Sequence, residues 1–502
     1  MKLQPTWWLK LAIGSLTLLL LLIGTIAFLM YPAFRSPPLA DFPAPASRLE
    51  ANRQDIAYLR DVLPRLDRSF TPAQWALFHQ DLDALREAAG TLDAAALEMG
   101  LAKAVARADN GHTNVMGAGW GLTLNSLPLR FYWFADGLYI LRADPAYPEL
   151  PGARVLALNG RAPDELVHLL SPYTGGGPAL KRELAVHFME SPQAMQAAGL
   201  AESALLSELT LRTSSGDDRV VTVNAIDAPA SGPAPARTPL TIMVDPRDLY
   251  WPRRDLSPVP LPEEAPFPHP TGEQRPWLHL LDNRSIPISL QHPHRFYWMT
   301  GLDDGKILFL QMNAAMDDPS DEPFAVFVNR VLAHVEKEAP RYAIVDFRSN
   351  LGGSYQLTAE FTRALPRAMP ENGRIFILTS ANTYSAGVIT TARLKYFSGD
   401  RATIVGEPLG DHARFWSEAA TRIVLPNSGL RIGYATGFHD WANGCTLRQI
   451  LICYPANYLL GVAAGDLDPT LPISWSFTDY LAGRDTAVEA VRDQIQRDQD
   501  DL

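Results

Sequence analysis

The second half of the chain alternates short apolar strands with amphipathic helices, and this alternation restricts the fold more than any other feature. Strands are predicted at "KILFLQMNA", "YAIVDFR", "RIFILTS" and "ATIVGEP", separated by helices predicted at "EPFAVFVNRVLAHVEKE", "YQLTAEFTRALPRA" and "SAGVITTARLKYF". Such alternation forms a mainly parallel sheet covered by helices. Loops at the carboxyl ends of the strands in such sheets carry chemistry. We therefore expect an α/β domain over residues 276–483.

Composition and periodicity divide the rest of the chain into segments with distinct patterns. Helical periodicity begins after Thr71, a predicted helix cap, with Pro72 at the first helical position. Hairpins are predicted at Asp136-Gly137 and around Gly216. The expected segments are a transmembrane anchor at 1–31, a Pro-rich stalk at 32–49, a helical region at 50–116, strands and turns at 117–226, a Pro-rich linker or surface excursion at 227–275, the α/β domain at 276–483 and a polar, solvated helical tail at 484–502.

The amino-terminal segment from Leu11 to Tyr31 contains 21 residues without a charge. A helix of this length crosses a hydrocarbon core of about 30 Å. Trp7, Trp8 and Tyr31 stand where interfacial aromatic residues are common. A cleavable signal peptide is the alternative, but its apolar region would be about 7–15 residues long and followed by a small-residue cleavage site. We expect an uncleaved single-pass anchor with the body on the extracytoplasmic (periplasmic) side.

Composition excludes several functional classes. Hydrophobic content of 47% and charged content of 20% are typical of a folded protein, and the net charge of −11 argues against nucleic-acid binding. Cys445 and Cys453 could form a disulfide in an oxidising compartment or remain two buried thiols. Two cysteines cannot form a structural zinc site alone, and no HExxH motif accompanies them. No metal or cofactor is expected.

Ser385 lies at the junction between a predicted strand and a predicted helix, where it could be a helix cap or a nucleophile. A serine nucleophile requires a base within reach and hydrogen-bond donors for the oxyanion. The amide of Ala386 is a candidate donor because amides at a helix start point outward. Gly352 and Gly353 in "NLGGS" could allow close approach of a ligand to the backbone, or could form only a tight turn.

Several motifs together resemble one family of enzymes. "YAIVDFRSNLGGS" followed by "ILTSANTYSAGVITTARLKYFSGDRATIVGEPLGD" is similar to the core of the C-terminal-processing (tail-specific) serine peptidases and their tricorn-core relatives. "GARVLALNGRAPDELVHLL" is similar to their PDZ-like domain, and "ARADNGHTNV" to their Asp-x-Gly-His-Thr segment. The resemblance covers most of residues 95–475.

The resemblance implies a crotonase/ClpP-like catalytic domain at 276–483 and a PDZ-like domain at 117–226. It also implies peptide hydrolysis through an acyl-enzyme with Ser385 as the nucleophile. The oxyanion hole would come from the Gly352/Gly353 region and Ala386.

The general base cannot be the lysine that processing peptidases use about 25 residues beyond the serine. Asp411 stands there, in "GEPLGDHARFW". Lys395 lies about 15 Å along the helix and roughly 80° around it from the serine. Tricorn-type relatives use a histidine before the PDZ-like domain, and His112 matches that position. His412 is the rival base.

Positions beside the base also differ from the relatives. Gly111 stands where they have a serine, so Thr113 is the nearest hydroxyl in sequence. Their orienting glutamate has no match in "NYLLGVAAGDLDPTLPI". Without the resemblance, His112 would be interpreted as a turn residue. The candidate orienting carboxylates are Glu407, which we rank first, and then Asp411, Asp466 and Asp468.

The sequence therefore predicts a membrane-anchored serine peptidase that acts on a peptide or protein, with catalytic residues Ser385, His112 and Glu407. The alternative is a catalytically inactive peptide- or lipid-binding protein on the same fold. Acyl-CoA chemistry on a crotonase-like fold is disfavoured by the anchor, the PDZ-like segment and the lack of a basic pocket motif.

Overall fold

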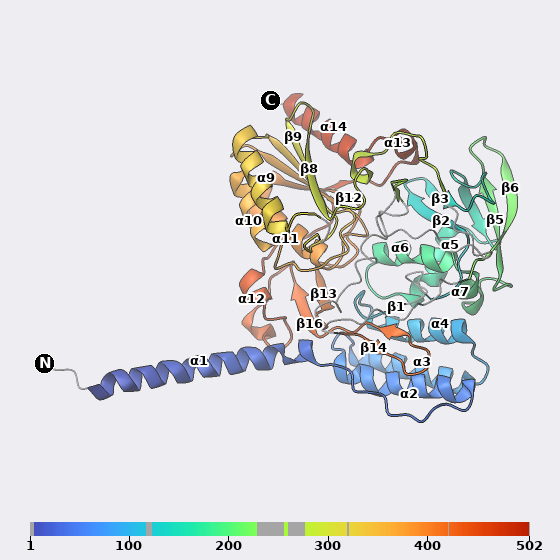
Figure 1. The fold of residues 1–502 in the computed structure, drawn as a ribbon, viewed down its shortest axis with the longest axis horizontal. Coiled ribbons are helices and arrows are strands. Elements are labelled where there is room, and N and C mark those ends of the chain that lie inside the picture. The colour runs from blue at the N-terminus through green and yellow to red at the C-terminus, as the bar shows by residue number, and fades with distance from the viewer. Residues whose placement is uncertain are drawn as a thin grey trace.

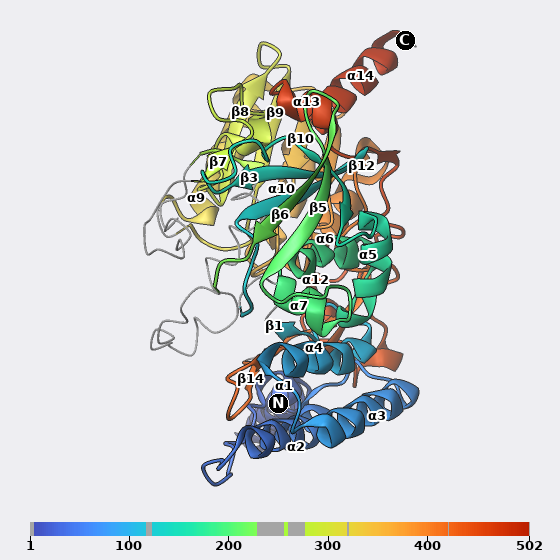
Figure 2. The same ribbon diagram turned by 90° about the vertical axis from the view of Figure 1, so that its right-hand side faces the viewer.

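The computed structural model describes residues 5–116, 123–227, 256–259, 277–318, 321–419 and 421–500. These residues form a mixed α/β fold around two large sheets, and an amino-terminal helix extends away from the body (Figure 1 and Figure 2). Most of the excursion predicted at 227–275 lies outside the described residues.

The first large sheet has six strands in the order β17-β12-β11-β10-β9-β8. β8 is antiparallel to β9, and the other neighbouring pairs are parallel. Its strands and helices are β8 (Tyr297–Leu302), β9 (Ile307–Met312), α9 (Phe324–Glu338), β10 (Tyr342–Asp346), α10 (Ala359–Ala368), β11 (Arg374–Thr379), α11 (Ala386–Ser398), β12 (Ala402–Gly406) and β17 (Leu471–Pro472). The predicted alternation of strands and helices is confirmed.

Side chains of the parallel sheet enter two separate cores, one on each face. Leu308 and Leu310 of β9 belong to the core that contains α9, α10 and α11. Ile307 and Phe309 alternate with them and pack on the other face with residues of α14 (Thr486–Asp500). Burial on both faces explains the nearly continuous apolar sequence of these strands.

The prediction of a solvated tail is wrong for α14. Val488, Val491 and Ile495 of this helix are buried against the sheet. Their spacing of three and four residues places them on one face of a helix. The sequence therefore contained a signal for burial that the polar composition of the tail concealed.

The second large sheet is antiparallel, in the order β2-β3-β4-β5-β6, with the short strand β7 also paired to β3. The hairpins predicted at Asp136-Gly137 and around Gly216 are confirmed. Its elements are β2 (Leu129–Phe134), β3 (Gly137–Ala143), β4 (Arg154–Leu158), α5 (Pro163–Leu170), α6 (Pro178–Met189), α7 (Pro192–Ala197), β5 (Leu206–Arg212), β6 (Asp218–Asn224) and β7 (Leu278–His279). The PDZ-like identity and the domain boundaries stay predictions.

Amino-terminal helices pack beside segments from the second half of the chain, and a capping box of Thr71 and Gln74 begins α3 as predicted. A three-stranded sheet in the order β1-β15-β14 joins the two regions. The elements are α2 (Arg48–Leu66), α3 (Pro72–Ala88), α4 (Ala94–Val105), β1 (Val115–Met116), β14 (Ile423–Val424) and β15 (Arg431–Ile432). Smaller elements of the second half are β13 (Arg414–Ser417), β16 (Gly437–Asp440), α12 (Asn457–Leu460) and α13 (Phe477–Leu481).

The helix that extends from the body in Figure 1 is α1 (Pro5–Phe34). Within the part of the chain that the structure describes, no helix is both long and apolar enough to span a membrane. The anchor predicted at 1–31 is therefore not confirmed.

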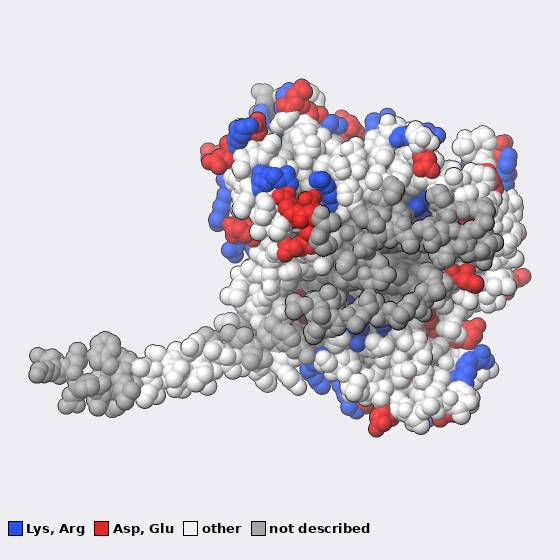
Figure 3. All heavy atoms as spheres, in the orientation of Figure 1, with Lys and Arg blue, Asp and Glu red and all other residues white. Residues whose placement is uncertain are grey.

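Charged side chains on the face shown in Figure 3 are intermixed, with Lys and Arg beside Asp and Glu over much of the described surface. No continuous basic band is visible on the described part of this face.

Candidate active site

Ser385 lies between β11 and α11, so the helix begins directly after it. Its φ of 53° and ψ of −120° place a non-glycine residue in a sparsely populated region of backbone space. Its side chain makes no capping hydrogen bond to the helix. The interpretation of Ser385 as a side-chain cap is therefore wrong, and the surrounding structure must hold a strained backbone that costs on the order of 1–3 kcal/mol.

Gly352 lies directly against Ser385. A Cβ atom built on Gly352 would lie 2.8 Å from the Cβ of Ser385, 3.2 Å from its Oγ and 3.4 Å from the amide nitrogen of Ala386. Gly353 is equally restricted, because its Cβ would lie 2.4 Å from the carbonyl oxygen of Ala315. Both glycines have positive φ, at 122° and 124°. Close approach to Ser385 is therefore the physical reason for glycine at position 352, and close approach to the backbone of Ala315 is the reason at position 353.

The backbone amides around Ser385 differ in their availability. The amide of Gly352 donates a hydrogen bond to Asn350 Oδ1 at 3.0 Å. The amides of Gly353 and Ala386 donate none to any of the described residues. The two amides available as oxyanion donors are therefore those of Gly353 and Ala386, while that of Gly352 is engaged.

Asp411 connects the serine to the histidine. Its Oδ2 lies 3.0 Å from His112 Nε2 and accepts a 3.4 Å hydrogen bond from the amide of Ser385. The Asp411 side chain is 2% exposed and that of His112 is 16% exposed. Because both nitrogens contact the same oxygen, the sum of the two distances, 6.4 Å, is an upper limit on their separation. The fold therefore brings His112 and Ser385 together, with Asp411 between them.

The imidazole of His112 is also fixed by its other neighbours. Its Nδ1 lies 3.3 Å from Ser417 Oγ. The ring stacks on Tyr384 with a centroid distance of 4.6 Å and on Phe415 with one of 5.5 Å. Both ring nitrogens thus have partners in this structure, and neither partner is the hydroxyl of Ser385.

His112 reaches the site through strand pairing that is remote in sequence. β1, which begins three residues after His112, pairs antiparallel with β15. The amide of Gly433 donates to the carbonyl oxygen of Asn114 at 2.8 Å. Thr113 donates a 2.7 Å hydrogen bond to buried Asp67. These contacts fix the segment that contains His112, and the contact of His112 Nε2 with Asp411 places the imidazole beside the loop after β12. They also engage Thr113 away from the imidazole.

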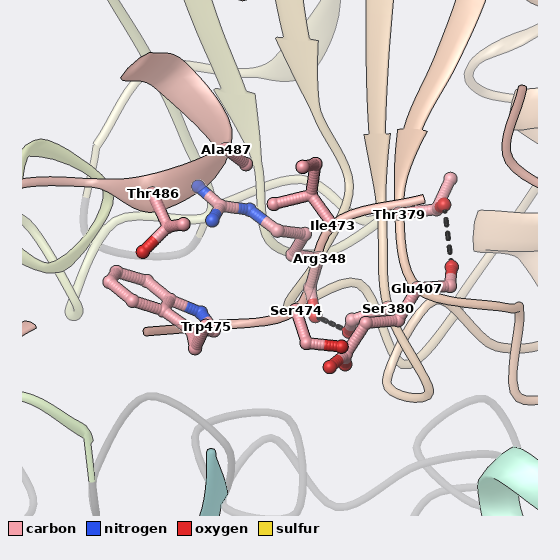
Figure 4. Close-up of a pocket in the computed structure, with 9 residues that line it drawn as sticks. All are labelled: Arg348, Thr379, Ser380, Glu407, Ile473, Ser474, Trp475, Thr486 and Ala487. Atoms are coloured by element: carbon pink, nitrogen blue, oxygen red, sulfur yellow. Dashed lines mark hydrogen bonds between the residues drawn. The ribbon is translucent and has the colours of Figure 1, made fainter. Parts of the chain in front are cut away.

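Glu407, the carboxylate ranked first from the sequence, lies elsewhere. Its side chain hydrogen-bonds to Ser474, and burial raises its pKa. It lines a small cavity of about 10 Å³ at the carboxyl ends of the strands (Figure 4). The cavity is lined by Arg348, Thr379, Ser380, Glu407, Ile473, Ser474, Trp475, Thr486 and Ala487. The carboxylate against His112 is Asp411, so the structure corrects the choice of Glu407.

The remaining sequence candidates do not contact Ser385 or His112. The side chain of His412 is exposed and lies near Gly177. Lys395 donates a hydrogen bond to the carbonyl oxygen of Asp466. It is therefore engaged elsewhere, in agreement with the prediction that it cannot be the base. Asp468 is exposed, and its amide bonds to Asp466. Among the described residues, no group of three or more His, Cys, Asp or Glu side chains could hold a metal ion.

Sequence reasoning missed the rings and the hydroxyl around His112. Ser417 and Phe415 belong to β13, which pairs with β16. Tyr384 precedes the serine directly, and burial together with nearby Asp411 raises the pKa of its phenol well above its usual value. The aromatic residue before Ser385 was visible in "NTYSAG", but its role depends on a histidine far away in sequence.

Cys445 and Cys453 form a disulfide. Of the two alternatives left open by their spacing, the pair of free thiols is therefore wrong.

Comparison with solved structures identifies similar folds. Mature CPAF complexed with lactacystin is 14% identical with a TM-score of 0.53, over 89% of this chain and 98% of that chain. Mature CPAF is 15% identical with a TM-score of 0.51, over 88% and 96%. The photosystem II D1 C-terminal processing protease is 12% identical with a TM-score of 0.31, over 88% of this chain and 99% of that chain.

Sequence comparison adds no further relative. No protein-family model matches the chain, and no curated protein matches it. The matches to CPAF show a shared fold, at identities that show the fold alone.

Proposed function

We propose that this protein is a serine-type peptidase in which Ser385 is the nucleophile and His112 is the general base. Asp411 takes the place of Glu407 as the carboxylate that positions the imidazole. The amides of Gly353 and Ala386 stabilise the oxyanion. The motif resemblance to C-terminal-processing peptidases and the fold shared with CPAF, which has been solved in complex with lactacystin, support this reaction class.

One observation carries the proposal: a single carboxylate oxygen contacts both the amide of Ser385 and the imidazole of His112. The two residues come from segments that are far apart in the sequence. The strained backbone of Ser385 and the glycine contact at 2.8 Å add a second reason to regard this serine as specialised.

The reaction follows from these positions. Ser385 Oγ attacks the peptide carbonyl carbon while its proton passes to a neutral nitrogen of His112. The resulting oxyanion accepts hydrogen bonds from the amides of Ala386 and Gly353. The imidazolium, stabilised by Asp411, then protonates the departing amine, and water hydrolyses the acyl-enzyme by the same route in reverse.

The imidazole must first turn toward Ser385. Its Nε2 contacts Asp411 and its Nδ1 contacts Ser417 in this structure. Catalytic hydrogen bonds often tighten only when substrate is bound. The shared carboxylate oxygen limits the separation of His112 Nε2 from the amide nitrogen of Ser385 to at most 6.4 Å.

The alternative function is that of a binding protein on the same fold. Because neither ring nitrogen contacts the Ser385 hydroxyl, a protein fixed in this arrangement would bind a peptide or a lipid without hydrolysing it. A different catalytic triad, formed by Ser417, His112 and Asp411, is the alternative for a hydrolase.

A fluorophosphonate probe with peptide mapping distinguishes these functions. The peptidase proposal predicts labelling of the purified full-length chain at Ser385, its loss in Ser385→Ala and its retention in Ser417→Ala. Labelling of Ser417 would assign the nucleophile to that residue instead. A cooperatively folded chain that neither this probe nor lactacystin modifies would favour the binding protein.

We also propose that residues 1–31 anchor the chain, with the body on the extracytoplasmic side. The uncharged stretch from Leu11 to Tyr31 supports the anchor. The Cys445–Cys453 disulfide supports an oxidising compartment, because disulfides are rare in the cytosol. The full chain should stay with membranes after an alkaline carbonate wash, and a chain lacking residues 1–31 should not. Release of the full chain would contradict the anchor.

A further inference from the structure

Helix α6 comes between β4 and β5 in the sequence and packs on the loop that precedes Ser385. Leu180 and Leu184 are buried against Tyr384. Tyr384 in turn stacks on His112. Glu183 lies on the same face of α6, because positions three and four residues apart on a helix are neighbours.

Glu183 makes a specific polar contact with this loop. Asn382 Nδ2 donates a 2.9 Å hydrogen bond to Glu183 Oε1. Asn382 is only 4% exposed and stands three residues before Ser385. A displaced Asn382 would therefore be expected to change the backbone that carries the nucleophile.

Further hydrogen bonds hold the same loop against the segment that follows β10. The amide of Asn382 donates to Ser380 Oγ at 3.0 Å, and Ser380 Oγ donates to the carbonyl oxygen of Arg348 at 2.6 Å. Thr383 Oγ1 donates to the carbonyl oxygen of Phe347 at 2.9 Å. These bonds join the loop to the segment that leads into the glycine pair. Glu183 adds a contact from helix α6, which packs with the antiparallel sheet.

We propose that Glu183 is a positioning residue for the reaction proposed above, on which this inference rests. Its hydrogen bond to Asn382 holds the Ser380–Tyr384 loop in the conformation that directs the Ser385 hydroxyl toward the substrate. Glu183 touches neither the reacting atoms nor His112, so it acts through Asn382 alone.

The surroundings of Glu183 make its charge depend on pH near neutrality. The pKa of Glu183 is raised from 4.5 to about 7, chiefly by burial and also by the carboxylate of Glu407, while the bond from Asn382 and the charge of Arg182 lower it. Burial raises the pKa of the phenol of half-buried Tyr132 on β2, and both carboxylates, with which it interacts electrostatically, raise it as well. Because the bond from Asn382 favours the ionised form, the loop is held more firmly above pH 7 than below it.

The test compares Glu183→Ala and Glu183→Gln with Glu165→Ala, a control at an exposed glutamate on α5 that pairs with Arg161. Two quantities are measured at pH 6 and pH 8: the fluorophosphonate labelling rate of Ser385, and amide hydrogen exchange over residues 380–388. Ser385 of Glu183→Ala should be labelled at least about tenfold more slowly, since small misplacements of a reacting group are costly. Its amide hydrogens at residues 380–388 should exchange faster than those of the wild type.

Glu183→Gln keeps an acceptor oxygen but has no charge. Its Ser385 should be labelled at close to the wild-type rate at pH 6. Its labelling rate should increase less than that of the wild type between pH 6 and pH 8. Asn382→Ala should reproduce the effect of Glu183→Ala, and the double variant should lose little more, because the two residues act through one contact. Glu165→Ala should match the wild type throughout.

Wild-type labelling and exchange in folded Glu183→Ala would overturn the inference. Should Glu183→Ala fail to fold, a wild-type rate and wild-type pH dependence in Glu183→Gln together with a wild-type rate in Asn382→Ala would overturn it equally. If the wild type is unreactive at Ser385, the proposed function fails, and the catalytic role of Glu183 fails with it. Faster exchange in Glu183→Ala would then show only that the loop contact exists.

Discussion

Asp411 Oδ2 lies 3.0 Å from His112 Nε2, although 299 positions of sequence separate the two residues. The same oxygen accepts a hydrogen bond from the backbone amide of Ser385. A carboxylate that is 2% exposed and shared in this way fixes both partners at once. The proposed catalytic groups are therefore organised around an aspartate at the position where the processing peptidases have a lysine.

Replacement of Asp411 should remove reactivity more than it removes structure. Asp411→Asn keeps the shape of the side chain but loses the charge that stabilises an imidazolium. We expect the labelling rate of Ser385 to fall by up to about 10⁴-fold, the loss of turnover that follows an Asp→Asn replacement in a Ser-His-Asp triad. Asp468→Asn, at an exposed aspartate, is the control. A folded Asp411→Asn protein with a wild-type rate would remove Asp411 from the mechanism.

Gly352→Ala should disable the serine through direct contact. The new methyl group would lie 2.8 Å from the Cβ of Ser385, at a φ of 122°. Overpacking of this kind costs about 1–3 kcal/mol, and we expect the labelling rate to fall at least tenfold.

Gly305→Ala separates this contact from backbone strain. Gly305 has a φ of 83°, but a Cβ atom added there would meet no atom within 4 Å. Its substitution should cost about 1–2 kcal/mol of stability from the unfavourable φ and leave reactivity unchanged. Equal labelling rates for the two alanine variants would show that the contact of Gly352 with Ser385 has no functional consequence.

Glu183 should make the protein less stable as pH rises. Its pKa of about 7 in the folded chain exceeds the ordinary value of 4.5, so the folded state retains a proton that the unfolded state has lost between these values. The free energy of unfolding therefore falls by at most about 3 kcal/mol between about pH 4.5 and pH 7. Above pH 7 this contribution stays lost. Glu183→Gln removes this contribution.

Denaturant unfolding at pH 5 and pH 8 measures the effect. The free energy of unfolding of the wild type should decrease more between these two pH values than that of Glu183→Gln, since all other titrating groups are common to both proteins. Identical pH dependence would mean that Glu183 ionises as it does in the unfolded chain.

The Cys445–Cys453 disulfide closes a short loop, with a sequence separation of 8. A loop of this size restricts the unfolded chain by about 2.5 kcal/mol in the chain-entropy model. The paired variant Cys445→Ser/Cys453→Ser should therefore melt at a lower temperature than the oxidised wild type and match the reduced wild type. An unchanged melting temperature in the variant would show that the bridge contributes nothing to stability.

The parallel sheet could be predicted from the sequence because its signals are local. β9 through β12 are mostly apolar runs, and the helix after Ser385 begins where the polar turn ends. The same kind of local signal was overlooked in α14, where Val488, Val491 and Ile495 mark a buried face.

The carboxylate beside His112 could not be chosen in the same way. Glu407 and Asp411 both follow β12 and are only four positions apart. Which of them faces the imidazole depends on where the segment of His112 lies, and this segment leads into β1, which pairs with β15. Such pairing between short strands leaves almost no pattern in sequence, and the same holds for the neighbour Ser417.

The most direct test of the account is the labelling rate of Ser385 when His112 is replaced. We predict that the wild type is labelled at Ser385 and that His112→Ala, folded to the same extent, reacts at least about 100-fold more slowly, the contribution expected of a general base. His412→Ala should react as the wild type does. Equal rates for the wild type and His112→Ala would contradict the proposal that His112 activates the serine.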